Sequence, residues 1–262
     1  MKKYQWCIPY LAVVLGMFIA TKYDLTLARW FYHPNQPLGI FFERIALLPI
    51  EFMIPICYFG LFQRNQHIVN GTGFVISTLI ILFDVFKYWF PMHEVWWHFL
   101  PVFLLVIVLF YRLLHRIPMT LWDKHEQFLR FYLTVALLTL ALTFGFKSLW
   151  GRVRFREMAG DDSSFTPWYV VNGYNNHHSF PSAHTAMMSL ILCRHMGLKM
   201  TTVKQKAVDG VLVLAMMVTR MMMGAHFFSD VLIGFTITYT LILLIDKMMY
   251  GSDRYGTTRY HI

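Results

Sequence analysis

Three short stretches of the sequence carry residue types that bind anions and transfer groups. The first runs from Lys147 to Arg154, the second from Ser179 to His184, and the third from Thr219 to Asp230. Charged and imidazole side chains are costly to place in apolar surroundings, so their grouping in three short stretches indicates a functional site. The candidate site residues are Lys147, Arg154, Ser182, Ala183, His184, Arg220, His226 and Asp230.

The three cations in these stretches favour phosphate as the ligand. The guanidinium groups of Arg154 and Arg220 match phosphate oxygens bidentately, and Lys147 adds a point charge. Residues 182–184 stand where a helix is predicted to begin, so backbone N–H groups and the positive end of the helix dipole can face the same anion. Because neighbouring cations repel one another unless an anion joins them, the sequence predicts a phosphate site.

His226 and Asp230 are spaced for nucleophilic catalysis. They lie four residues apart at the predicted start of a helix, so the carboxylate can hold one ring nitrogen and leave the other free to attack. A single histidine near a helix end is more often a hydrogen-bonding residue than a catalyst. The combination of the three stretches nevertheless favours a catalytic role for His226, with His184 as a second imidazole.

Other polar residues leave alternatives open. His177 and His178 raise the possibility of a zinc site, but no cysteine or close carboxylate stands at a ligand spacing, so an exposed loop is favoured and no metal is predicted. Arg152 and Arg156 flank Arg154, and each either contacts headgroup phosphates or is simply solvated.

Composition excludes an ordinary soluble domain. Of the 262 residues, 57% are hydrophobic and 14% are charged, against roughly 45–50% and about 25% in soluble proteins. The net charge is +9, but the 23 Lys and Arg are dispersed without a basic run, so nucleic acid is not a predicted partner. The 3 cysteines are scattered and form no disulfide or metal-binding pattern.

Eight apolar runs are candidates for membrane helices, each near the ~17–25 residues that a span needs. The second contains Pro49, Glu51 and Pro55, so it is expected to be kinked or partly re-entrant. The predicted fold is all-α, a polytopic membrane helix bundle with six to eight transmembrane helices. The runs cover residues 6–21, 45–62, 71–90, 96–112, 128–147, 182–198, 207–224 and 228–248.

Two features within these runs favour structural roles. Asp84 and Lys87 lie three residues apart, which favours an ion pair on one helix face. A group of methionines between Met216 and Met223 favours adaptable packing over metal binding.

The distribution of positive charge predicts the orientation. If the spans alternate from a cytoplasmic N-terminus, most of the 23 Lys and Arg lie at cytoplasmic ends. The three chemical stretches then meet at the outer ends of four helices. The sequence predicts a multi-pass protein of the plasma (cytoplasmic) membrane with its site facing outside.

The order and spacing of the three stretches resemble the type 2 phosphatidic acid phosphatase superfamily, whose members are related to the vanadium haloperoxidases. The family pattern is Lys-x6-Arg-Pro, then Pro-Ser-Gly-His, then Ser-Arg-x5-His-x3-Asp. The resemblance extends over about residues 128–248. The positions that match are Lys147, Arg154, Pro181, Ser182, His184, Arg220, His226 and Asp230. Three positions depart from the pattern: Phe155 stands in place of Pro, Ala183 in place of Gly, and Thr219 in place of Ser.

The resemblance implies a role for each residue. His226 would attack phosphorus to form a phosphohistidine, Asp230 would orient and support it, and His184 would protonate the leaving oxygen and later activate water. The three cations, with Ser182 and the backbone N–H groups around Ala183, would hold the phosphate oxygens. The resemblance implies no metal or other cofactor.

The resemblance also implies a haloperoxidase-like phosphatase core at 128–250 and an activity. The apolar runs and the charge distribution add N-terminal transmembrane helices over residues 1–127 before the core and a cytoplasmic tail at 251–262 after it. The expected activity is that of a metal-independent lipid phosphatase, acting at the outer face on a phosphomonoester or diphosphate of a lipid, for example an isoprenoid diphosphate. A phosphotransferase remains an alternative, as does a non-catalytic anion-binding protein or transporter. Membrane lipids are expected partners, and the oligomeric state is open.

Overall fold

The computed structural model describes residues 7–89, 99–158, 160, 162–197 and 201–254, and within these ranges the regular structure is entirely helical. This confirms the predicted all-α fold class. The predicted tail, 251–262, lies outside the described residues from residue 255 onward. The α-helices are α1 (Cys7–Phe31), α2 (Pro37–Arg44), α3 (Leu48–Asn65), α4 (Ile68–Trp89), α5 (Leu100–His115), α6 (Met119–Trp150), α7 (Ala183–Met188), α8 (Cys193–Gly197), α9 (Val203–Met222) and α10 (Phe228–Arg254).

Five helical segments of the described chain are long and apolar enough to cross a membrane. A sixth, Leu100–His115, is apolar but shorter. These segments confirm a polytopic membrane helix bundle. The five are Cys7–Phe31, Pro37–Asn65, Ile68–Lys87, Met119–Glu157 and Phe228–Gly251.

The apolar run at 182–198 does not form one straight helix. It consists of α7, a 3₁₀ segment η4 (Ser189–Leu192) and α8. Two carbonyl oxygens of α7 accept hydroxyl hydrogen bonds: Ser189 donates to Thr185 over 2.7 Å, and Thr238 of α10 donates to Ala186 over 2.8 Å. Side-chain bonds to helix carbonyls compete with the helical ladder, which accounts for the break after α7.

The run at 45–62 was expected to be kinked. Its break falls at residues 45–47, between α2 and α3, and α3 then continues through Pro55. Pro49 occupies the first turn of α3, where a missing backbone N–H costs nothing. The helix therefore starts cleanly after the break.

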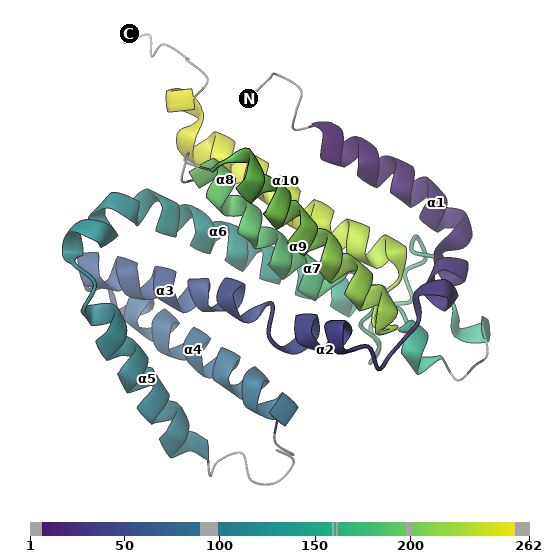
Figure 1. The fold of residues 1–262 in the computed structure, drawn as a ribbon, viewed down its shortest axis with the longest axis horizontal. Coiled ribbons are helices and arrows are strands. Elements are labelled where there is room, and N and C mark those ends of the chain that lie inside the picture. Colours follow the sequence, from purple (N-terminus) through teal and green to yellow (C-terminus); the bar gives the residue numbers. More distant parts are fainter. Residues whose placement is uncertain (1–6, 90–98, 159, 161, 198–200, 255–262) are drawn as a thin grey trace. The chain divides into compact units, whose positions relative to one another are not determined.

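The chain divides into two compact units, and residues 44–134 form the smaller one. In this unit α3 and α4 form a helical hairpin against which α5 packs (Figure 1). Phe59 is fully buried there and makes edge-on contacts with Phe74 and Tyr111. Asp84 and Lys87 form the expected pair, with 3.9 Å between Nζ and Oδ1.

Residues 1–43 and 135–262 form the larger unit, which contains every candidate site residue. Here α1 runs antiparallel to α10, and α7 packs against both α9 and α10 (Figure 1). Met216, Met217, Met221 and Met223 are buried, which fits the packing role expected of the methionine group.

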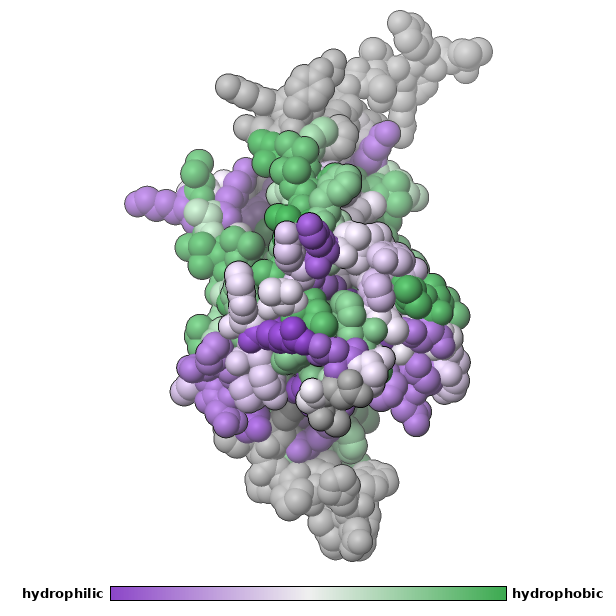
Figure 2. Space-filling view, turned by 90° about the vertical axis from the view of Figure 1, so that its right-hand side faces the viewer, coloured by the Kyte–Doolittle hydropathy of each residue, from purple (hydrophilic) through white to green (hydrophobic). Residues whose placement is uncertain are grey.

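An irregular connection over residues 151–182 joins α6 to α7 and is tied to α1. The indole N–H of Trp168 donates to Thr21 Oγ1 over 3.1 Å, and Arg29 forms an ion pair with Asp162. The connection also exposes Val171 and Tyr174. Figure 2 shows the face on which it lies, where hydrophilic side chains border hydrophobic surface.

Candidate active site

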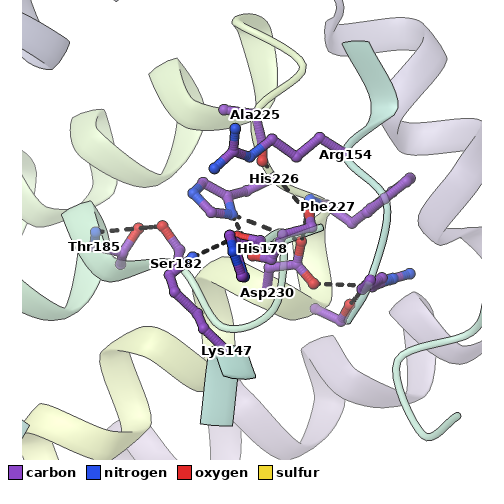
Figure 3. Close-up of polar contacts among 12 residues, drawn as sticks. Lys147, Arg154, His178, Ser182, Thr185, Ala225, His226, Phe227 and Asp230 are labelled. Atoms are coloured by element: carbon purple, nitrogen blue, oxygen red, sulfur yellow. Dashed lines mark hydrogen bonds and ion pairs between the residues drawn. The ribbon is translucent and has the colours of Figure 1, made fainter. Parts of the chain in front are cut away.

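The predicted site residues meet at one end of the larger unit. The charges of Lys147, Arg154 and Arg220 all act on the imidazole of His184, and Figure 3 shows Lys147 and Arg154 approaching the ring of His226 from different sides. The positioning elements are the last turn of α6 (Lys147), the following connection (Arg154), the N-cap and first turn of α7 (Ser182 to His184), the last turn of α9 (Arg220), the loop after it (His226) and the first turn of α10 (Asp230).

The tautomer of His226 follows from one hydrogen bond. Its Nδ1 lies 2.6 Å from the carbonyl oxygen of Ser179. A carbonyl can only accept, so Nδ1 must carry the proton and Nε2 must carry the lone pair. Burial lowers the pKa of His226 from 6.5 to about 3. Near neutral pH the ring is therefore an uncharged imidazole whose Nε2 is unprotonated and has its lone pair free.

Asp230 does not hold the His226 ring directly, which corrects the expectation from their spacing. Its Oδ2 lies 3.8 Å from Nδ1, too far for a hydrogen bond. That oxygen instead accepts from the Ser179 hydroxyl over 2.6 Å and from the Phe227 backbone N–H over 2.8 Å. Ser179 thus connects the two residues, since its carbonyl binds the imidazole while its hydroxyl binds the carboxylate.

Arg152 occupies the interior of the unit, contrary to both alternatives drawn from the sequence. Its side chain is 0% exposed, so it neither is solvated nor reaches a headgroup. Nη1 donates to Asp230 Oδ1 over 2.6 Å, and Nη2 donates to Asp24 Oδ2 of α1 over 2.9 Å. The guanidinium carbon also lies 4.1 Å from the ring centre of Phe227, a cation–π contact.

Phe155, which stands where the family pattern has proline, belongs to an aromatic cluster beside this arginine. Its ring packs edge-on against Tyr32, at the end of the α1 segment, with 5.1 Å between ring centres. It also meets Phe227 edge-on at 6.3 Å. The aromatic ring in place of proline therefore packs against Phe227, the ring that contacts the guanidinium of Arg152.

Each of the three phosphate-binding candidates has a protein partner. Lys147 Nζ donates to the carbonyl of His178 over 2.5 Å, and Arg154 Nη1 donates to Glu157 Oε1 over 3.0 Å. The Arg154 Nε is buried and finds no hydrogen-bond acceptor among the described residues. A buried donor without an acceptor costs free energy unless a ligand satisfies it, so Arg154 is suited to bind an anion.

Arg220 is almost fully buried, and its charge is balanced from α2. Its Nη2 donates to Glu43 Oε1 over 3.2 Å. Gly39, one turn earlier in α2, lies against Met223 at the end of α9 so closely that an added Cβ would stand 2.7 Å from the sulfur atom. The glycine therefore allows α2 to bring Glu43 to Arg220.

The start of α7 is built by Ser182 and fixed against α10. The Ser182 hydroxyl accepts from the Thr185 backbone N–H over 3.4 Å and shares a hydrogen bond with the Thr185 hydroxyl. A Cβ at Gly234 of α10 would stand 2.4 Å from the Ser182 carbonyl oxygen. Only glycine permits this approach, which brings the first turn of α7, beginning at Ala183, beside the helix that carries Asp230.

Among the described residues, no group of three or more His, Cys, Asp or Glu side chains could hold a metal ion. His177, one of the two histidines that raised the zinc alternative, has its Nδ1 3.3 Å from Glu157 Oε2. It therefore contacts the same carboxylate that pairs with Arg154.

Sequence reasoning missed three residues of this site. Ser179 lies within a recognised stretch but had no assigned role. Asp24 and Glu43 lie far upstream, in the first helices. Asp24 lies beyond the apolar run at 6–21 predicted from the sequence, and α1 extends past that run to include it.

The fold and the site define a helical membrane protein with a buried cluster of cations and imidazoles. Residues 128–254 match the family model described as the PAP2 superfamily. This segment of the chain therefore belongs to that superfamily, which confirms the resemblance seen in the sequence and indicates a phosphatase-type activity. No curated protein and no solved structure matched the chain. Asp24 and Glu43 both lie outside the matched segment.

Proposed function

We propose that this protein is an integral-membrane lipid phosphatase that works through a phosphohistidine intermediate. The observation that carries the proposal is the state of His226: its Nδ1 proton is directed to the Ser179 carbonyl, which leaves an unprotonated Nε2 with a free lone pair beside Lys147 and Arg154. A neutral nucleophile surrounded by fixed cations is suited to attack a phosphate ester, whose charge would repel an anionic nucleophile.

In the first step, Nε2 of His226 forms a bond to phosphorus and the bond to the lipid oxygen breaks. His184, protonated once the negative charge of the bound phosphate offsets the nearby cations, donates a proton to that leaving oxygen. Lys147, Arg154 and Arg220, with the Ser182 hydroxyl and the backbone N–H of Ala183, hold the equatorial oxygens. The transition state spreads charge over those oxygens, so fixed cations and N–H groups stabilise it.

In the second step, water replaces the enzyme on phosphorus. His184, now neutral, takes a proton from the water as its oxygen attacks phosphorus and the P–N bond breaks. Between the steps the phosphorylated ring of His226 carries a positive charge, while its Nδ1 keeps its proton and donates it in the hydrogen bond to the Ser179 carbonyl. The nearby carboxylate of Asp230 stabilises that charge, with 3.8 Å between Oδ2 and Nδ1.

The site supplies through its own side chains the positive charge that many phosphoryl-transfer enzymes take from Mg²⁺. We therefore expect hydrolysis without a divalent metal. The substrate proposed is a phosphomonoester or diphosphate of a lipid, such as an isoprenoid diphosphate. Exposed apolar residues on the connection over 151–182, including Val171, support contact with the surrounding lipid.

Phosphate release by detergent-purified protein tests this proposal. We expect inorganic phosphate to be released from at least one of phosphatidate, phosphatidylglycerol phosphate, an isoprenoid diphosphate or a lipid A-type phosphate, and the rate to persist in EDTA. A Lys147→Met preparation controls for contaminating phosphatases. Appearance of phosphate on an added alcohol would identify a phosphotransferase. If the protein transfers phosphate to neither water nor the alcohol but still binds orthophosphate, the anion-binding alternative is favoured. Complete loss of phosphate release in EDTA would refute metal independence.

The proposed outward orientation makes a separate prediction about accessibility. Ser164 lies exposed on the connection beside the site, and Val203, 84% exposed, lies at the start of α9. We expect a cysteine placed at Ser164 to react with a membrane-impermeant maleimide in intact cells and one at Val203 to react only after permeabilisation. The reverse pattern would place the site in the cytoplasm. The native chain without an added cysteine measures background labelling of Cys7, Cys57 and Cys193.

A further inference from the structure

A buried chain of charges joins the first membrane helix to the proposed nucleophile. Asp24 of α1 and Asp230 of α10 share the single guanidinium of Arg152, with contacts of 2.9 and 2.6 Å. Ser229 completes the cluster: its hydroxyl accepts from Arg152 over 2.8 Å and donates to Asp24 over 2.5 Å. These four side chains are at most 3% exposed, so water does not screen their charges.

The balance of these charges bears on the proposed chemistry. Two carboxylates and one guanidinium leave the cluster with one net negative charge. Without the charge on Asp24, Arg152 would neutralise Asp230 alone. Asp230 would then offer less stabilisation to the positive ring that forms when His226 is phosphorylated.

We propose that Asp24 is a positioning residue for catalysis, which acts on His226 through Arg152 and Asp230. This inference rests on the proposed function and extends it to a helix outside the family segment at 128–254. Asp24 orients the guanidinium of Arg152 and balances part of its positive charge. The negative charge of Asp230 can then stabilise the positive ring of phosphorylated His226. It has no described hydrogen bond with Lys147, Arg154 or Arg220.

The position of Asp24 predicts a change in kcat and not in KM. The charge on His226 develops only during phosphoryl transfer, so an interaction with it stabilises the transition state and not the bound substrate. For Asp24→Asn we expect kcat to fall about 10- to 100-fold, by analogy with the loss of outer-shell partners in metal sites. KM and the inhibition constant of orthophosphate should stay within about threefold of wild type.

Asp162→Asn is the matched control. Asp162 also joins α1 to the connection, through Arg29, but both side chains are about half exposed and neither has a described contact with Arg152. We expect this variant to keep kcat within about twofold, as exposed ion pairs contribute little. Asp24→Glu restores the charge with one extra methylene and should recover part of the lost turnover.

The results separate this inference from the proposed function. If the wild-type protein releases phosphate from no lipid, the proposed function itself fails. If the wild type is active and folded Asp24→Asn keeps normal kcat, or raises KM alone, the positioning role is overturned. Equal losses in Asp24→Asn and Asp162→Asn would also overturn it, because they would indicate general loosening of α1.

A second variant covers the case in which Asp24→Asn does not fold. Ser229→Ala removes the hydroxyl that lies between Arg152 and Asp24 and retains every charge. We expect kcat to fall several-fold with KM unchanged. A folded Ser229→Ala protein with wild-type kcat would overturn the inference in that case.

Discussion

Replacement of His226 with alanine is expected to abolish turnover while phosphate binding survives. The variant removes the only atom proposed to form a bond with phosphorus but leaves the cations around it in place. Loss of a catalytic nucleophile costs several orders of magnitude, so we expect kcat to fall at least about 10⁴-fold. In wild-type protein, rapid denaturation during turnover should trap a phosphoprotein that is stable in alkali and labile in acid, as a phosphohistidine is.

The control for His226→Ala is a second histidine of the same unit. His33 follows α1. Its Nδ1 lies 3.0 Å from the carbonyl oxygen of Phe31, and its side chain has no described hydrogen bond with a proposed phosphate-binding residue. His33→Ala should retain turnover and the trapped phosphoprotein. Substantial hydrolysis by folded His226→Ala, or a phosphoprotein in that variant, would assign the nucleophile to another residue.

Asp230→Asn is expected to cause a loss of both activity and stability. All three described partners of the Asp230 side-chain oxygens are donors: the Arg152 guanidinium, the Ser179 hydroxyl and the Phe227 backbone N–H. An asparagine must turn its NH₂ group toward at least one of them. Loss of one carboxylate also leaves Arg152 with Asp24 as its remaining counter-charge. Since Asp24 still balances Arg152, the expected cost is that of a buried donor left without an acceptor, about 1–3 kcal/mol.

The loss of turnover in Asp230→Asn should exceed what instability alone explains. The nearest comparison is the ~10⁴-fold fall when the aspartate of a serine protease triad becomes asparagine. Asp209→Asn provides the control, since Asp209 is also fully buried and pairs with Arg194 near the other end of α9. Both variants should show a lower unfolding temperature, but only Asp230→Asn should lose kcat in its folded fraction. Comparable kcat in the two variants would leave Asp230 a purely structural residue.

The sequence predicted the parts of this site that local spacing controls. The three stretches place their cations and histidines at helix ends, and helix ends are set by short-range patterns such as the Ser182 cap of α7. The membrane helices followed from apolar runs for the same reason. The break inside the run at 182–198 did not follow, because it depends on Thr238 of α10 bonding to an α7 carbonyl.

The contacts that sequence reasoning missed join residues far apart in the chain. The bond between Nδ1 of His226 and Ser179 is made by a backbone carbonyl, which every residue possesses, so no side-chain pattern could indicate it. The four-residue spacing places His226 and Asp230 near the start of α10, as predicted. The Asp230 carboxylate, however, accepts hydrogen bonds from Ser179 and Phe227 and not from the His226 ring. Arg152 looked like a surface cation because nothing nearby in the sequence indicates that a carboxylate of α1 reaches it.

The separation of Asp24 and Arg152 by 128 residues has a consequence for how the protein is made. Because α1 is synthesised long before Arg152, the carboxylate of Asp24 does not yet have this arginine as its counter-charge when α1 leaves the ribosome. Arg152 is synthesised 128 residues after Asp24 and 78 residues before Asp230, so Asp24 is the first of its two carboxylate partners to be available. The last helix to emerge supplies the final charge, and the nucleophile acquires its fixed surroundings only when the first and last membrane helices have come together. The site is therefore complete only in protein in which α1, the connection after α6 and α10 have all packed together.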